Sequence, residues 1–297
     1  MTSLRLLIPA LLLLAAVAAA QTPNPPATQA SAPPPPASGT NPKGKRVPSA
    51  KTKPEYDAYL AAANTADATA AEGLARAFEV QFPNSELLPV LYQQVMAKYQ
   101  KVDNGDKALD MGRKILQYDP DNTIALVMNA TVLAERTRQS DLDRDSRLNE
   151  AAADAQRAID NMRTGNYMLA PNATPEQVQQ FKDQVIGIAY TALGTAELVR
   201  NNNAAAEQNL RKAAESPTGK GDAIVWYRLA LALDHQNKYD DASTAITTAV
   251  ALAPANSAVA DKAKAEQSRL KQLAASGAPS SSAPKSNQPE PEVAQPK

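Results

Sequence analysis

The chain has 297 residues, no cysteine, a single histidine and a formal net charge of zero. The absence of cysteine excludes disulfides and thiol chemistry, and the balanced charge provides no general attraction to nucleic acid or to anionic membranes. The central part, residues 55–275, is rich in alanine and leucine and poor in glycine, a composition that favours helices.

Residues 1–20 have the pattern of a secretory signal peptide. Arg5 precedes an apolar run over residues 6–20, which ends in AVAAA and so places alanine at positions 18 and 20. The run is shorter than the roughly twenty apolar residues of a membrane-spanning helix, and small residues at these two positions suit cleavage after Ala20. We therefore expect an exported protein that starts at Gln21 and is located in a bacterial periplasm.

Two proline-rich segments flank the central part. Residues 21–54 contain ten prolines and no aromatic residue, and residues 276–297 consist mainly of Ser, Pro, Ala and Gln. Neither segment can bury enough apolar surface to offset the entropy of ordering it, so both are predicted to be disordered. The first segment is also basic, and we interpret it as a solvated linker, with weak contact to an anionic envelope surface as the alternative. Its cations are Lys43, Lys45, Arg46, Lys51 and Lys53.

A helical hairpin is predicted near the C-terminal end of the central part. Residues 226–233 place Trp, Leu, Ala and Leu at i, i+3, i+4 and i+7, and residues 242–249 place Ala, Ile and Ala at i, i+4 and i+7. Pro254 follows, where the second helix must stop. Small side chains at Ala230 and Ala242 allow the two helix axes to approach closely.

The same hairpin pattern recurs along the chain. In three copies, sixteen residues separate the first aromatic residue from the small residue that opens the second helix: Tyr92 to Ala108, Tyr190 to Ala206 and Trp226 to Ala242. Weaker copies start at residues 55 and 126. The weaker copy at 126 has a lengthened inter-helix loop, and an insertion at 161–175 follows it. Thr174 and Gln177 then predict a capping box at the start of the next helix. A non-repeating helical bundle is the alternative, but one spacing found three times favours a repeat.

This pattern resembles the tetratricopeptide repeat family over residues 55–256, as five units, with 257–275 as a capping helix. The resemblance implies an all-α fold, a right-handed superhelical solenoid of antiparallel helix pairs between disordered tails. Asn129 departs from the family pattern, which has leucine there, and must either form hydrogen bonds or pack loosely. Asn129 and the insertion after this unit together lead us to expect a break in the solenoid at residues 161–175.

Catalytic and metal-binding patterns are sparse, so no enzyme activity, cofactor or metal is expected. His235 has no nucleophile motif beside it, and we interpret it as a polar residue near a helix C-terminus. Asp141, Asp143 and Asp145 are spaced like the start of a calcium loop. Ser146 and Ala152 stand where such a loop needs Gly and Glu, so a solvated loop is the preferred interpretation and adventitious calcium the alternative.

The resemblance implies that a protein or peptide binds the concave face, which is lined by the first helix of each unit. We predict a scaffold or adaptor of this kind. The alternative is a structural spacer subunit of an envelope complex, with no function for the groove. Each groove residue could instead pack against the neighbouring unit. The predicted groove residues are Tyr56, Leu60, Gln93, Ala97, Val127, Thr131, Thr191, Thr195, Tyr227 and Leu231.

Overall fold

The computed structural model describes residues 45, 48–169, 173–276 and 280. Over these residues the chain forms eleven α-helices and one short 3-10 turn, with no strand. The predicted signal peptide, most of the proline-rich linker and nearly all of the C-terminal tail lie outside the described residues.

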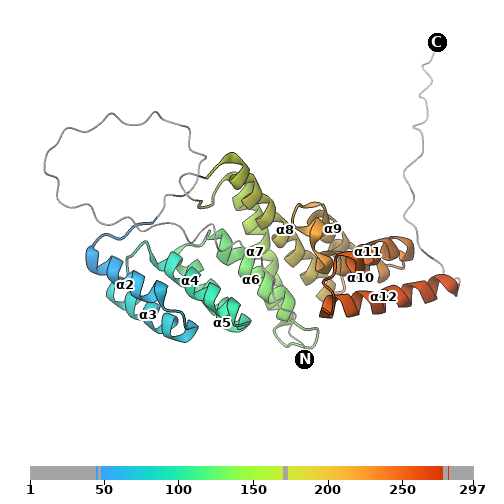
Figure 1. Cartoon of the computed structure of the whole chain (residues 1–297), viewed down its shortest axis with the longest axis horizontal. Helices are drawn as coiled ribbons and strands as arrows, with labels where there is room; N and C mark the ends of the chain where they lie inside the picture. The colour runs from blue at the N-terminus through green and yellow to red at the C-terminus, as the bar shows by residue number, and fades with distance from the viewer. Residues whose placement is uncertain (1–44, 46–47, 170–172, 277–279, 281–297) are drawn as a thin grey trace, which may run out of the picture.

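The helices form five antiparallel pairs and a terminal helix, stacked in chain order from α2 to α12 (Figure 1). The predicted solenoid of helix pairs is therefore confirmed. The 3-10 turn, η1 (Gly219–Gly221), lies between the fourth and fifth pairs. The pairs are α2 (Lys53–Asn64) with α3 (Ala68–Gln81), α4 (Leu88–Lys101) with α5 (Gly105–Tyr118), α6 (Thr123–Arg136) with α7 (Arg144–Thr164), α8 (Pro175–Val199) with α9 (Asn203–Glu215), and α10 (Ala223–Asp234) with α11 (Tyr239–Leu252), followed by α12 (Ala258–Ala275).

The turn inside a pair uses a left-handed residue at one fixed place in the repeat. Asp103, Asn201 and Asn237 have φ values of 56°, 60° and 59°. Each lies eleven residues after the aromatic residue that marks its copy. Asn and Asp tolerate this conformation better than other non-glycine residues. The tight reversal between the two helices of a unit is thus specified locally.

Small residues allow close helix crossings, as predicted. Ala230 and Ala242 are fully buried between α10 and α11. In the fourth pair, a Cβ added to Gly194 would lie 2.5 Å from Cγ of Leu210, so only glycine fits at this crossing. The predicted capping box at the start of α8 is also present, because Thr174 and Gln177 each accept the other's backbone N–H.

Buried carboxylates join the first two units. Glu72 on α3 accepts a hydrogen bond from the Tyr99 hydroxyl on α4 and forms a 3.1 Å ion pair with Lys107 on α5. Burial alone would raise the pKa of Glu72, but these partners and Arg76 lower it overall. A second cluster of the same residue types is formed by Glu79, Tyr92 and Lys114. Each of these residues lies seven positions from its counterpart in the first cluster, on the same helix.

The structure does not support a break at residues 161–175. Helix α7 continues to Thr164 and ends at Gly165, which has a φ of 80°. The chain then folds back so that Tyr167, 5% exposed, packs against Phe181 of α8 with 5.8 Å between ring centroids. One apolar cluster consequently runs from α2 through α8, and a second covers α9 to α12. The boundary between the clusters lies after α8.

The third unit agrees with its prediction in part. Its inter-helix loop, residues 137–143, is longer than the loop inside any other pair, and α7 is also lengthened. Asn129 is fully buried, and neither of its polar atoms has a hydrogen-bond partner among the described residues. It is not loosely packed either, since a Cβ on Gly112 would lie 1.9 Å from its Oδ1. The Asn129 side chain takes the space that glycine leaves on α5.

Candidate functional site

The predicted groove residues divide into an accessible set and a buried set. The half-buried residues are Tyr56, Leu60, Ala97, Thr191, Tyr227 and Leu231. The buried residues are Gln93, Val127, Thr131 and Thr195. Only the first set can contact a partner without rearrangement, so the groove interpretation is confined to the two ends of the solenoid and to Thr191.

Helix α6 does not line a groove, and the prediction for Val127 and Thr131 is wrong. Every residue from Thr123 to Ala134 is buried, because α5, α7 and α8 surround the helix. The Thr131 hydroxyl donates to the Val127 carbonyl at 2.8 Å. Here the packing interpretation is correct, since the long helix α8 covers the side of α6 that a partner would need.

Helix α8 also offers little to a partner. The Thr195 hydroxyl is buried and donates to the Thr191 carbonyl at 2.7 Å, and Thr191 donates in turn to Gly187 at 2.9 Å. Both hydroxyls are therefore used within their own helix. The prediction for Thr195 as a groove residue is wrong because its side chain is buried.

An ion pair joins the first helices of the third and fifth units. Arg228 on α10 lies 3.1 Å from Glu135 on α6, and the two side chains are only 12% and 18% exposed. Beside it, burial raises the pKa of the Tyr227 hydroxyl, and the negative charge of Glu266 on α12 raises it further. Tyr227 therefore lies near Glu266 of the terminal helix, and its ring packs against the C-terminal apolar cluster.

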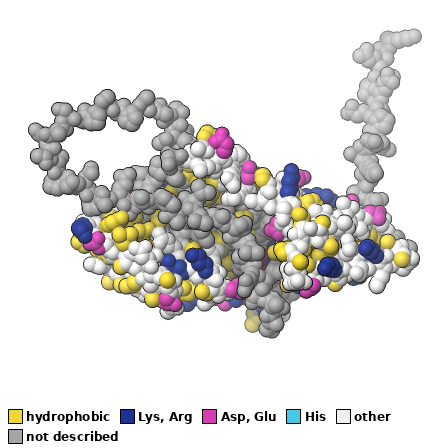
Figure 2. All heavy atoms as spheres, viewed as in Figure 1, with side chains coloured by type: hydrophobic (Ala, Val, Ile, Leu, Met, Phe, Trp, Pro, Cys, Tyr) yellow, Lys and Arg dark blue, Asp and Glu magenta, His cyan; other side chains and the backbone are white. Residues whose placement is uncertain are grey.

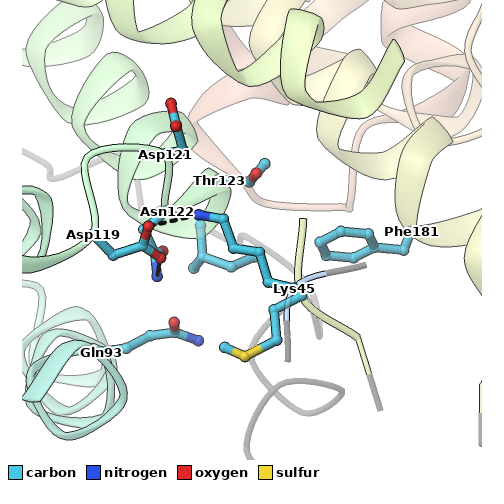
Figure 3. A pocket seen from close by; sticks show the side chains of 9 residues that line it. Lys45, Gln93, Asp119, Asp121, Asn122, Thr123 and Phe181 are labelled. Carbon is cyan, nitrogen blue, oxygen red and sulfur yellow. Dashed lines mark hydrogen bonds and ion pairs between the residues drawn. The ribbon is translucent and has the colours of Figure 1, made fainter. Parts of the chain in front are cut away.

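A small hollow lies at the N-terminal end of α6 (Figure 3). Its volume is about 20 Å³, room for a single water-sized group. It lies between α4, the α5–α6 loop, the segment after α7 and the start of α8. The lining residues are Lys45, Gln93, Asp119, Asp121, Asn122, Thr123, Ile124, Met168 and Phe181. Gln93, predicted as a groove residue, is 6% exposed at this hollow.

Lys45 enters the hollow from the proline-rich segment. Its Nζ lies 2.6 Å from Asp119 Oδ1, and its backbone N–H donates to the Tyr167 carbonyl at 3.0 Å. The expectation of a solvated linker is therefore wrong at Lys45. The side chains of Lys51 and Lys53 are exposed, as expected of a solvated segment, although Lys51 Nζ donates to the Asn84 carbonyl at 3.3 Å and Lys53 already begins α2. Helical periodicity could not have found this contact, since Lys45 and Asp119 lie outside helices.

The other candidate residues have ordinary structural partners. His235 is exposed, and its Nδ1 lies 3.2 Å from Oδ1 of Asn203. Asp145 pairs with Arg144 at 2.9 Å, and Asp141 accepts a backbone N–H at 2.8 Å. Over the described part of the chain, no group of three or more His, Cys, Asp or Glu side chains is arranged to hold a metal ion.

Comparison with known proteins identifies the last helix pair. A family model described as tetratricopeptide repeat matches residues 223–256, which cover α10 and α11. The chain carries a tetratricopeptide repeat. The repeat predicted for the last unit is thereby confirmed, and the other helix pairs share its antiparallel architecture.

Solved structures give weaker similarity than the repeat model. A crystal structure of MamA protein has a TM-score of 0.39 and 17% identity, covering 63% of this chain and 88% of that one. A second MamA crystal structure has a TM-score of 0.37 and 17% identity, covering 62% and 96%. At this level neither comparison bears on function. No curated protein sequence matches the chain.

None of the helices in the described ranges is long and apolar enough to cross a membrane.

Proposed function

We propose that the protein is an exported scaffold that binds another protein through the accessible end of its concave face, at α2 and α4. The observation that carries this proposal is the half-buried apolar strip formed by Tyr56, Leu60 and Ala97 on two successive first helices. Hydrophobic side chains are exposed over this end of the molecule in Figure 2. Stacked repeats commonly use such extended surfaces for binding. We also propose that the protein is not an enzyme and that it acts in a bacterial periplasm.

The spacer function is the second candidate, and a specific contact favours it. The ion pair between Arg228 and Glu135 ties the fifth unit to the third, and the burial of α6 leaves no accessible groove residue in the third unit. A rod of this kind could hold two other components apart without a groove ligand.

A paired substitution distinguishes the two functions. Leu60→Glu places a charge on the proposed binding strip, while Val80→Glu places the same charge on α3, where the side chain is 84% exposed. Both full-length variants would be used as bait in extract of the source organism. A groove scaffold loses its captured protein with Leu60→Glu and keeps it with Val80→Glu. Equal capture by both variants would favour the spacer.

A further inference from the structure

We propose that the hollow beside Asp119 is a subsite for a lysine or arginine side chain carried on an extended peptide of the partner protein, and that Lys45 of this chain occupies it in the free protein. The inference rests on the proposed scaffold function and names the chemistry of its partner. It extends the binding surface from the α2–α4 strip to the start of α6, along the loops that join successive units.

The first observation is a desolvated ion pair. The Lys45 and Asp119 side chains are only 28% and 25% exposed, and the Nζ–Oδ1 distance is 2.6 Å. Surface ion pairs with mobile side chains contribute little. In this pair, Asn122 also donates to the second Asp119 oxygen at 3.3 Å, which fixes the carboxylate toward the incoming cation. A carboxylate oriented in this way selects a basic side chain.

The second observation is main-chain recognition. The Lys45 N–H donates to the carbonyl of Tyr167 at 3.0 Å. Tyr167 is held in place by the Phe181 ring at 5.8 Å and by the Lys182 ammonium 5.6 Å above its own ring. A fixed carbonyl binds an extended backbone irrespective of sequence, while a side-chain pocket beside it supplies specificity. The insertion after α7 therefore forms one wall of a peptide site.

The third observation is a buried hydroxyl group in the hollow to which Lys45 does not donate a hydrogen bond. Thr123 is 5% exposed and lines the hollow, yet its hydroxyl oxygen has no hydrogen-bond partner among the described residues. A buried hydroxyl without a partner is costly. A hydrogen-bond donor longer than the Lys45 ammonium would satisfy it. An arginine, whose guanidinium carries several donors in a planar fork, has donors for both the Asp119 carboxylate and the Thr123 hydroxyl.

Tethering explains why Lys45 would occupy the site until a partner arrives. Lys45 lies eight residues before the start of α2, and a group on so short a tether has an effective concentration that can reach the millimolar range. One ion pair and one backbone hydrogen bond are then enough to keep the segment bound, while a partner that also covers the α2–α4 strip can displace it. Lys45 acts in this proposal as an internal competitor.

The test uses full-length protein and a labelled peptide. The probe is the acetylated, fluorescein-labelled peptide of residues 43–52, KGKRVPSAKT, with binding followed by fluorescence anisotropy. Lys45→Ala removes the internal competitor, so this variant should bind the peptide at least tenfold more tightly than the unmodified protein. Adding Asp119→Asn should weaken that binding at least tenfold. Adding Asp106→Asn, an exposed carboxylate on α5, should leave it unchanged.

A change in the peptide guards against variants that fail to fold. The Lys45→Ala protein is also tested with a second probe, in which alanine replaces the peptide lysine that corresponds to Lys45. This probe should bind at least tenfold more weakly, although it keeps its other basic residues. A probe with arginine at that place should bind at least as well as the original. No binding to the Lys45→Ala protein, or equal binding of the lysine and alanine probes, would overturn the proposal. Those results would leave the pull-down comparison at Leu60 unaffected.

Discussion

Asp154 is expected to make the protein less stable as the pH rises from acid to neutral. It lies on α7 beside Asn129, and its Oδ2 is buried with no hydrogen-bond partner among the described residues. Burial raises the pKa of Asp154 to about 7, and the negative charge of Glu150 contributes, while the positive charges of Arg157 and Arg113 act in the opposite direction.

The sign follows from proton binding. The unfolded chain releases the Asp154 proton near pH 3.9, whereas the folded protein keeps it until about pH 7. Between these values the folded state binds more protons, so the free energy of unfolding decreases as pH rises and levels off above the folded pKa. A difference of about three between the two pKa values corresponds to about 4 kcal/mol. Because the side chain is only half-buried, solvent screening reduces this to about 2 kcal/mol.

Asp154→Asn removes the titration while keeping the shape of the side chain. The gain in stability of this variant should grow by about 1–2 kcal/mol between pH 5 and pH 8, which is about 2–8 °C in Tm. Thermal unfolding followed by circular dichroism at four pH values measures it. Asp160→Asn, at an exposed carboxylate on the same helix, is the control and should not change the pH dependence. If Asp154→Asn keeps the slope of the unmodified protein, the assignment to this carboxyl is wrong.

Three other substitutions and one mass measurement test the packing and the processing. Gly112→Ala should destabilise the protein by about 1–3 kcal/mol, since its Cβ would lie 1.9 Å from a buried amide oxygen. Gly73→Ala, where nothing outside the adjoining helix backbone lies within 4 Å of the new Cβ, should stabilise the protein by about 0.5–1 kcal/mol; urea midpoints of both variants measure the two effects. Ala242→Leu overpacks the α10–α11 crossing, so hydrogen exchange should lose protection from α9 to α12 and keep it from α2 to α7. Uniform loss would mean a single cooperative unit. Intact mass of protein from the native host should begin at Gln21, and retention of residues 1–20 would contradict the signal-peptide prediction.

Periodicity was sufficient to predict the helix pairs because it reports which side of each helix is apolar. The sixteen-residue spacing from Trp226 to Ala242 reflects one hairpin geometry, and the structure adds a left-handed Asn237 at a fixed place between them. Small residues were equally informative, because Gly194 and Ala230 lie where two axes approach. These features are local, so a single unit contains the information that specifies them.

Burial that depends on several units at once could not be predicted in this way. Val127 occupies the same repeat position as the half-buried Tyr56 and Tyr227, yet it is fully buried because α8 packs along α6. Nothing within the third unit signals that contact. All first helices turn the same face toward the groove. Whether that face is accessible depends on the lengths of the neighbouring helices, which can cover it.

The hollow at Asp119 depends on an even longer range of sequence. Lys45 and Asp119 are 74 residues apart, and Tyr167 lies a further 48 residues along. Composition predicted solvation for the segment of Lys45, since a proline-rich basic stretch cannot form its own core. That argument considers only the apolar surface that the segment could bury by folding on itself. It leaves out a carboxylate and a carbonyl that other parts of the chain hold in place, to which a single lysine of the segment can bind. A disordered composition is therefore compatible with a specific contact, and basic residues next to a repeat domain should be tested as ligands of that domain.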